Sequence, residues 1–505
     1  MRPGRDGSPR MGARVARGVA WAAAVFVGGL LLGGCTGTGG DSDGLVRREV
    51  TWYKDVQPVI MENCVGCHYS GSPQSLGAFD SYETSKAYAS AILAKVEGDD
   101  SAPYNMPPFP PIDQDPRCEI PGPLRDDPRL SEIDVKVIHN WVAQDMPEGD
   151  PADEAPFVRQ PPPGLSGSNL MEFAGVNHSV PAARADRITG LVDLDHTQCF
   201  SVGLDPENSV LLTGFEVVTD PAAPDIVHHV IIGTDPYGDT YPALQHDDAF
   251  DGQFHDCESD TPRNSVLMYT YTPGGAPLVL PKDSAFPLRG GARITFTVHY
   301  HRGQTEVLDN STLRLSLAEE TPTYLAYMGR FGAASTGEGM WTYRKGRAHG
   351  GWDKTVGSAP FALASGDEDY KMTWKEDNML PRDYPIWSVF PHMHYAGTGI
   401  KISLEHNDGS HTCLGHINPF DFAWQTTYQY ERPIEELPVF GGTDDGKKDG
   451  DVVKIACTYN NTMGNDRLRD ALLANGYDEP LDVVVGEDSF DEMCVMHYGL
   501  ILPWP

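Results

Sequence analysis

The sequence is poor in basic residues, and this shortage excludes one class of function. Lysine and arginine total 38 against 72 aspartates and glutamates, so the formal net charge is −34 over 505 residues. Nucleic-acid binding depends on a basic surface that neutralises phosphates. A chain with this balance is therefore not expected to bind DNA or RNA. Its charge otherwise predicts only a soluble protein that repels anionic surfaces.

Long hydrophobic runs are also missing. The apolar stretch near the N-terminus runs from Val19 to Leu32, which is shorter than the roughly 20 residues that span a bilayer. Five arginines precede it, as in a secretory signal peptide. The stretch leads into Leu-Leu-Gly-Gly-Cys, which resembles a bacterial lipobox, so Cys35 is predicted to carry a lipid. An ordinary secretory peptide with an incidental cysteine is the alternative.

This leader predicts an exported protein that is tethered to a membrane by lipid. We assign residues 1–34 to the signal peptide and residues 35–50 to a flexible tether rich in glycine, serine and aspartate. Threonine follows Cys35, whereas aspartate is associated with retention in the inner membrane. We therefore expect a periplasm-facing lipoprotein and favour the outer membrane.

Cysteine is scarce, with nine in the chain, and one motif accounts for two of them. The segment Cys-Val-Gly-Cys-His that begins at Cys64 is a CxxCH motif, which is the attachment signature of c-type haem. Cys64 and Cys67 would bind the two vinyl groups, and His68 would be the proximal ligand of the iron. For the distal ligand we favour Met106, in a Met-Pro-Pro loop similar to that of class I cytochromes c. Met146 is the rival.

The chain divides into a helical part and a longer β part. Over residues 51–152, apolar residues recur at helical spacing before the CxxCH motif and again after a capping-box-like start at Ser131. We expect a small all-α cytochrome c domain there, followed by a proline-rich linker over residues 153–167. The remaining chain has strand-like runs separated by turns rich in glycine, proline and aspartate. It predicts two β domains, over residues 168–321 and 322–505.

Histidines are grouped within the β part. The groups are His228 with His229, His299 with His301, His392 with His394, and His497 with Met493. Alternate residues of a strand share a face, whereas adjacent histidines reach one metal only at a bulge or through different ring nitrogens. Imidazoles with a thioether, and no cluster of thiolates or carboxylates, favour copper over zinc or calcium. For any single group, a hydrogen-bonded core histidine is the alternative.

The order of these groups resembles the copper type II monooxygenases, which include peptidylglycine α-hydroxylating monooxygenase and dopamine β-monooxygenase. The resemblance covers roughly residues 190–500 and rests on HH, VHY, HxH and (D/E)EMC in the same order. It implies two antiparallel jelly-roll β-sandwiches whose coppers face each other across a cleft. The implied ligands are His228, His229 and His299 for an electron-transfer copper, and His392, His394 and Met493 for the catalytic copper that reacts with dioxygen.

The same resemblance implies two disulfides, Cys199–Cys257 and Cys457–Cys494. Cys118 and Cys413 have no counterpart in the family. They are therefore either free or paired with each other. A bond between them requires the haem-bearing part to dock on the β part near Cys413.

Three positions depart from the peptide-hydroxylating branch of that family. The arginine that grips the substrate carboxylate in that branch, two residues before the HxH pair, is replaced by Phe390. An asparagine and a tyrosine after the ligand methionine are replaced by Val495 and His497. Without this clamp a glycine-extended peptide is not the expected substrate, and the pocket is predicted to be more apolar. His497 could instead be an extra ligand or a proton donor.

Together these features predict a lipid-anchored copper monooxygenase with two copper ions and one haem c. It would hydroxylate a C–H bond of a small molecule or peptide with dioxygen, and its electrons would pass from a periplasmic donor through the built-in haem. The alternative is a non-enzymatic electron-transfer or copper-binding lipoprotein that uses the same ligands.

Overall fold

The computed structural model describes most of the chain after the tether. The described residues are 48–65, 68, 77–98, 106–107, 118–127, 129–154, 164–165, 169–173, 178–185, 192–193, 195–220, 226–235, 255–256, 266–272, 275–333, 340–344, 347–352, 362–377, 382–422, 424–443, 450–486 and 490–504. The predicted lipid site Cys35, the haem cysteine Cys67 and the disulfide cysteine Cys257 lie outside them. Within the described residues, no helix is long and apolar enough to cross a membrane.

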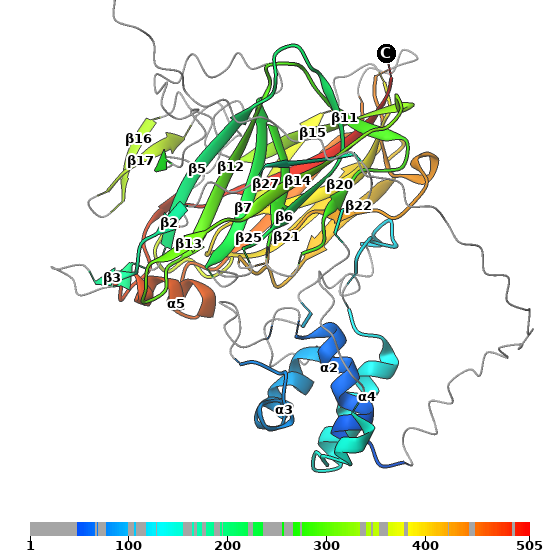
Figure 1. Ribbon diagram of the computed structural model, residues 1–505. Helices are drawn as coiled ribbons and strands as arrows, with labels where there is room; N and C mark the ends of the chain where they lie inside the picture. Colours follow the sequence, from blue (N-terminus) through cyan, green and yellow to red (C-terminus); the bar gives the residue numbers. More distant parts are fainter. Residues whose placement is uncertain are drawn as a thin grey trace, which may run out of the picture.

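Helices gather at the N-terminal end of the described chain, below the sheets in Figure 1. A π-helical turn, η1 (Trp52–Val56), leads into α2 (Gln57–Asn63), and α3 (Tyr82–Glu97), α4 (Glu132–Ala143) and a 3-10 turn, η2 (Pro151–Asp153), follow. The side chains of Ser81 and Ser131 accept backbone N–H bonds at the starts of α3 and α4, which satisfies donors that a helix start leaves unpaired. Trp52 and Trp141, with ring centroids 5.7 Å apart, lie at the centre of this helical cluster.

The rest of the described chain is mainly β-strand, arranged in three larger sheets. A 10-stranded sheet has the order β1 (Leu170–Phe173), β14 (Thr312–Leu317), β6 (Val210–Val218), β11 (Ser284–Leu288), β15 (Tyr324–Ala333), β27 (Cys494–Pro503), β20 (Tyr384–His392) and β23 (Tyr428–Gln429), with β10 (Leu278–Val279) beside β6 and β24 (Val439–Phe440) beside β20. A five-stranded sheet has the order β8 (His255–Asp256), β5 (Asp195–Gly203), β12 (Arg293–His301), β7 (Val227–Asp235) and β9 (Val266–Tyr271). A four-stranded sheet has the order β19 (Tyr370–Asp377), β25 (Val452–Tyr459), β21 (Gly397–Glu405) and β22 (His411–Ile417).

Short elements complete the β part. The two-stranded pairs are β2 (His178–Val180) with β13 (Val307–Asp309), β3 (Arg184–Ala185) with β4 (Val192–Asp193), β16 (Met340–Arg344) with β17 (Arg347–Trp352), and β18 (Ala362–Leu363) with β26 (Val483–Val484). Two helical elements lie among them, the 3-10 turn η5 (Ile434–Glu436) and α5 (Asp466–Ala474).

One sheet runs through both of the expected β domains. Strand β11 pairs in parallel with β15, and in this pairing Ser284 lies opposite Tyr324 and Ala285 opposite Leu325. The 10-stranded sheet therefore combines strands from both sides of the boundary that the sequence predicts near residue 322. One hydrophobic core also extends through both halves, from Phe200 and Phe215 to Trp387 and Ile501.

The predicted fold class, a small all-α cytochrome c domain followed by two antiparallel β-sandwich (jelly-roll) copper domains, is wrong. Strands predominate in several sheets, helices are few, and the described residues do not form a separate all-α domain. Cys118, Ile120 and Leu124, all within the range assigned to that domain, are buried in the core of the β part instead. The periodicity before Cys64 and after Ser131 identifies helices, but it carries no information about this segment between them.

A disulfide fixes this segment to the β part. Cys118 is bonded to Cys413 of β22, with Cα atoms 5.0 Å apart, which is one of the two alternatives that the sequence leaves open. Backbone hydrogen bonds support the same contact, since Arg125 donates to the carbonyl of Gln429 at 2.9 Å and Glu431 donates to that of Pro123 at 2.8 Å. The segment is therefore held by both covalent and backbone contacts.

Replacing Cys118 and Cys413 together with alanine is expected to lower the stability of the whole chain. The bond closes a loop of 295 residues, and the loop-closure entropy of a loop of this size corresponds to roughly 6 kcal/mol in the unfolded state. Chemical denaturation of the oxidised protein measures the change. An unfolding midpoint equal to that of the wild type would show that the backbone contacts of Arg125 and Glu431 suffice to hold the segment.

Candidate metal centres

Three histidines converge on the adjacent strands β7 and β12. His229 lies opposite His299 in the antiparallel ladder, but the next pair is Val227 with Tyr300. β7 therefore has one more residue than β12 at this point, and the extra residue is His228. Such a β-bulge breaks the alternation of side chains along a strand. It is the local irregularity that two adjacent histidines need in order to approach one ion.

The ring nitrogens of these histidines lie at ligand distances from one another. Nδ1 of His229 is 3.1 Å from Nδ1 of His228 and 3.3 Å from Nδ1 of His299. One ring nitrogen from each of the three histidines can be chosen so that all three nitrogens lie within 4.8 Å of one another. The ring of His299 is buried. The group contains only imidazoles, which suits copper or zinc better than calcium or magnesium.

A second pair of histidines lies at the end of β20. The Nε2 atoms of His392 and His394 are 3.1 Å apart. On the opposite side of each ring, Nδ1 of His392 contacts Oε1 of Gln425, and Nδ1 of His394 lies 3.1 Å from the carbonyl oxygen of Asp491. When both Nδ1 atoms carry hydrogen and donate to these oxygens, both Nε2 lone pairs point to the same place. Partners of this kind orient metal-binding imidazoles in proteins.

A buried carboxyl group joins the backbone of the third predicted ligand, Met493, to that of His394. Oε2 of Glu492 accepts the backbone N–H groups of His394 at 3.0 Å and of Met493 at 2.9 Å, and Oε1 accepts that of Gly397 at 2.9 Å. Glu492 is fully buried, and burial raises its pKa to about 8, although the backbone hydrogen bonds act in the opposite direction. The segments that carry His394 and Met493 are thus joined at one side chain.

The sequence alone indicates no role for Glu492. The only available signal was its place in the (D/E)EMC motif directly before Met493. An acidic residue beside a candidate ligand is ordinarily interpreted as a possible ligand itself. Two of the three backbone N–H groups that Glu492 accepts, those of His394 and Gly397, lie 98 and 95 residues away along the chain.

Burial keeps the imidazole of His392 neutral. Burial lowers the pKa of His392 to about 4. The hydrogen bond with Gln425 raises the pKa, and the positive charge of Arg330 lowers it further. A neutral ring retains the lone pair that a metal requires. His497, whose role the sequence left open, lies with its ring centroid 5.6 Å from that of Phe390, one strand away from His392. The side chain of His301 is not among those described.

The described residues that the sequence predicts to bind haem lie in the helical cluster and beside it. The ring of His68 stacks on Phe79 with centroids 4.5 Å apart, and burial lowers its pKa. The backbone N–H of Met106 donates to the carbonyl of Lys95 near the end of α3. The rival Met146 packs against the helical core, where its carbonyl accepts a hydrogen bond from Tyr82. The choice between Met106 and Met146 as the distal ligand stays a prediction.

The remaining cysteines are assigned in part. Cys457 of β25 is bonded to Cys494 of β27, with Cα atoms 6.0 Å apart, as the family resemblance implies. Cys199 also takes part in a disulfide, and its predicted partner lies outside the described residues. Because Cys494 directly follows Met493, the Cys457–Cys494 bond restrains the backbone next to the third predicted ligand.

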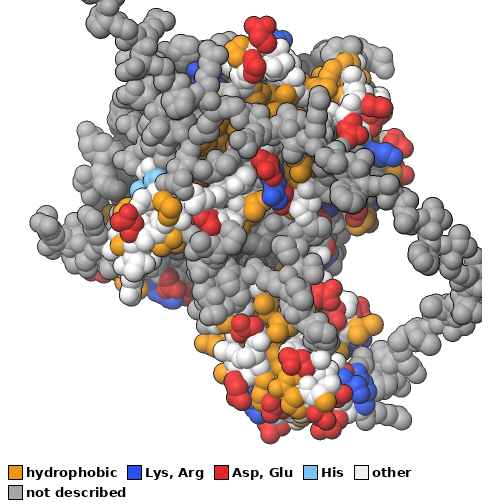
Figure 2. Space-filling view, in the orientation of Figure 1, with side chains coloured by type: hydrophobic (Ala, Val, Ile, Leu, Met, Phe, Trp, Pro, Cys, Tyr) orange, Lys and Arg blue, Asp and Glu red, His pale blue; other side chains and the backbone are white. Residues whose placement is uncertain are grey.

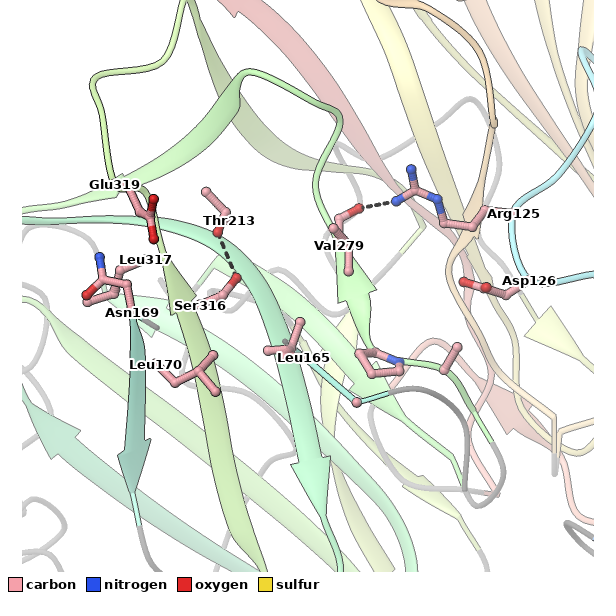
Figure 3. Close-up of a pocket in the computed structure, with 13 residues that line it drawn as sticks. Arg125, Asp126, Leu165, Asn169, Leu170, Thr213, Val279, Ser316, Leu317 and Glu319 are labelled. Atoms are coloured by element: carbon pink, nitrogen blue, oxygen red, sulfur yellow. Dashed lines mark hydrogen bonds between the residues drawn. The ribbon is translucent and has the colours of Figure 1, made fainter. Parts of the chain in front are cut away.

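A cavity of about 500 Å³ lies apart from these histidines. Leu165, Leu170 and Asn169 contribute to its lining, and Figure 3 shows Arg125 donating to the carbonyl of Val279 beside it. None of the predicted haem or metal ligands lines this cavity. The size of the cavity does not indicate a function. The candidate metal centres are therefore defined by histidine nitrogens that lie close together.

Comparison with known proteins does not place the chain in a family. No family model matches it, and no curated protein matches it. Solved structures that match include one of infectious bursal disease virus Gx strain, 7% identical over 66% of this chain and 72% of that chain, with a TM-score of 0.16. Another is VP54 of PBCV-1 fitted into a reconstruction of the virophage Sputnik, 8% identical over 66% of this chain and 94% of that chain, with a TM-score of 0.17. Scores this low support no conclusion about fold or function.

Proposed function

We propose that the protein is a copper-dependent monooxygenase that hydroxylates a C–H bond with dioxygen. The observation that carries the proposal is the convergence of His228, His229 and His299 at a β-bulge, where three ring nitrogens lie within 4.8 Å of one another. The second pair, His392 and His394, supports a second copper. The sequence resemblance to the copper type II monooxygenases agrees with both.

The donor atoms at the two centres fit copper in different ways. The first centre offers three imidazoles, and the second offers two imidazoles on a backbone that Glu492 joins to Met493. Bound copper would supply one-electron chemistry, for which an all-imidazole site suits electron transfer and a soft thioether favours Cu(I), the state that reacts with dioxygen.

The residues around the second centre have distinct tasks. Gln425 and the carbonyl of Asp491 hold the Nδ1 protons of the two imidazoles. Glu492 fixes the backbone that carries His394 and Met493. Phe390 and Val495, both buried, provide apolar surface next to His392, which keeps water away from it. The chain thus orients the ligands before any metal binds.

We further propose a covalently attached haem c as the electron carrier. Cys64, Cys67, His68 and Met106 would hold it, and a periplasmic donor would reduce it. The CxxCH motif and the partly buried ring of His68 support this assignment. A lipid on Cys35 would keep the protein at the membrane, with the outer membrane favoured.

Metal analysis tests the two copper sites. Protein matured with copper and with the haem-attachment machinery is expected to contain copper and iron at about two to one, and the His299→Ala variant at about one to one, because it removes a ligand from the first centre only. His411→Ala, which changes an exposed histidine of β22, serves as the matched control and should keep the wild-type ratio. If the protein contains no copper after it has been loaded with excess copper, the proposal is ruled out.

Covalent haem is tested separately. Replacing Cys64 and Cys67 together with alanine should remove the haem absorbance from denatured protein, because both thioether bonds are lost, while copper content stays at two. Haem that remains attached in this variant would contradict the assignment. A variant that loses haem and both coppers together would show instead that maturation of the whole chain has failed, and refolding with copper alone then measures the copper sites.

A further inference from the structure

One loop carries two side chains that border the second metal centre. It comprises residues 418–427, between β22 and β23, and is described except at one position. Gln425 of this loop contacts Nδ1 of His392. The ring of Phe422 lies edge-on to that of His394, with centroids 5.8 Å apart. The two histidines predicted as ligands at the second centre therefore lie against the same loop.

The N-terminal part of the chain is attached to both ends of this loop. Before the loop, Cys413 of β22 is bonded to Cys118. After the loop, Tyr430 forms an isolated antiparallel bridge with Leu124. Residues 118–127, which make these contacts, lie between the helical cluster and the sheets (Figure 1).

Tyr430 also joins the two ends of the loop to each other. Its side chain is buried, and its hydroxyl group donates to the carbonyl of Leu414, the residue after Cys413, at 2.6 Å. Two residues further along, Nε of Arg432 donates to the carbonyl of Gly122 at 2.6 Å. The N-terminal part and both ends of the loop thus form one connected unit.

The middle of the loop lies near the helical cluster as well. Asp421 is paired with Arg467 of α5 at 2.6 Å. Both charges act on Lys95 of α3: burial lowers the pKa of Lys95, Arg467 lowers it further, and Asp421 raises it. The end of α3 therefore lies close to the part of the loop that precedes Phe422.

The overall charge of the chain opposes this contact. The net charge is −34, and acidic side chains are spread over both the helical cluster and the β part on the face that Figure 2 shows. Parts that carry charge of the same sign repel each other. The position of the N-terminal part against the loop therefore depends on the disulfide and on the hydrogen bonds.

We propose that the N-terminal part is a structural component of the second metal centre, in which the Cys118–Cys413 bond positions Gln425 as the hydrogen-bond acceptor for Nδ1 of His392. The inference rests on the proposed copper function and adds a condition to it. The second centre is complete only after the disulfide has formed. Cys118 and Cys413 are thus positioning residues that act through Gln425.

The first centre does not share this condition. His228, His229 and His299 lie on the five-stranded sheet. The printed contacts of residues 118–127, by contrast, reach β22, β23 and β10, which belong to the other two large sheets. Loss of the disulfide is therefore expected to affect the second centre selectively.

The copper affinity of each centre, measured by competition with a chelator, tests the inference in full-length chains that keep only one centre. His299→Ala keeps the second centre, and His394→Ala keeps the first. In the His299→Ala chain, replacing Cys118 and Cys413 together with alanine should weaken copper binding at least about tenfold, because loss of a partner that orients a metal ligand reduces affinity about 10–100-fold. In the His394→Ala chain the same replacement should leave copper affinity unchanged.

A double-mutant cycle shows whether the disulfide acts through Gln425. In the His299→Ala chain, Gln425→Leu removes the acceptor and should weaken copper binding by a comparable factor, whereas Gln425→Glu keeps an acceptor oxygen and should not. Adding the cysteine replacement to Gln425→Leu should cause little further loss, because both changes remove the same contact. Losses that multiply would show that the disulfide does not act through Gln425.

Leu288→Ala is the control for general loss of stability. Leu288 is buried in β11, which pairs with β6 and β15, and its truncation removes core volume. It should leave copper affinity unchanged in both single-centre chains, and an effect equal to that of the cysteine replacement would overturn the inference. If the cysteine variant does not fold, Arg432→Gln replaces it in the same comparisons, because it removes only the bond to Gly122.

A measurement on metal-free protein separates this inference from the proposed function. The 15N resonances of a labelled imidazole show which ring nitrogen carries the hydrogen. His392 should carry it on Nδ1 in the wild-type chain, because Gln425 accepts it there, and should lose this preference in the cysteine variant. If this result is obtained and no chain binds copper, the copper function is rejected and the positioning role is supported. If the His392 resonances are the same with and without the disulfide, the inference is overturned whether or not copper binds.

Discussion

Replacing Glu492 with alanine is expected to lower the free energy of unfolding by about 2 to 6 kcal/mol. The carboxylate is fully buried and accepts backbone N–H groups from His394, Met493 and Gly397. Alanine would leave the N–H groups of His394 and Met493 buried without an acceptor, whereas that of Gly397 keeps the carbonyl of His394 at 3.1 Å. Each unsatisfied group costs about 1–3 kcal/mol. Urea denaturation with the disulfides intact measures the loss. Copper content should also fall from two to one, because the segments that carry His394 and Met493 separate.

Glu405→Ala is the matched control for this change. The carboxylate of Glu405 is paired with Lys375 and Lys454 at the surface and keeps 39% of its side-chain area exposed. Exposed pairs of this kind contribute about 0–1 kcal/mol, so the unfolding midpoint should move little and both coppers should remain. If Glu492→Ala is no more destabilising than Glu405→Ala, the buried carboxylate does not organise the centre.

Replacing Met493 with isoleucine is expected to weaken binding of Cu(I) at the second centre by well over tenfold. Loss of a partner that only orients a ligand already reduces metal affinity about 10–100-fold, and here a predicted ligand is removed. The sulfur favours Cu(I), so the affinity for Cu(II) should change less. Competition with a Cu(I)-specific chelator measures the first affinity and titration of the oxidised protein the second. Oxygen uptake by the reduced, copper-loaded protein should also be lost.

Met496→Ile is the control for packing. Met496 is fully buried three residues further along, on the β27 face that packs into the main hydrophobic core, whereas Met493 groups with Val495 outside that core. The control should lower the melting temperature but leave Cu(I) affinity unchanged. The opposite pattern, in which Met493→Ile destabilises the fold and keeps Cu(I) affinity, would identify Met493 as a packing residue. Oxygen uptake that persists without a bound second copper would favour the non-catalytic alternative.

Local patterns in the sequence predicted the histidine groups but not how they come together. Pro-His-Met-His places His392 and His394 on one face without any knowledge of the fold. The adjacent pair, His228 and His229, required a bulge, and whether a bulge exists depends on the register against His299 in another strand. The fold also has features that local sequence predicts and features that depend on distant contacts. Helices near Trp52 and Trp141 follow from periodicity, whereas burial of Cys118 in the β core depends on a contact 295 residues away.

The parallel pairing of β11 with β15 has a consequence for any attempt to study the two histidine-bearing halves apart. Cutting the chain at the predicted boundary would leave the paired ends of both strands, Ser284 with Ala285 and Tyr324 with Leu325, without their partners, and it would also divide the hydrophobic core that extends through both halves. Unpaired strand segments of this kind recruit further strands and promote aggregation. Each half alone is therefore expected to precipitate or to form mixed oligomers, and equimolar co-expression of the two pieces should restore solubility.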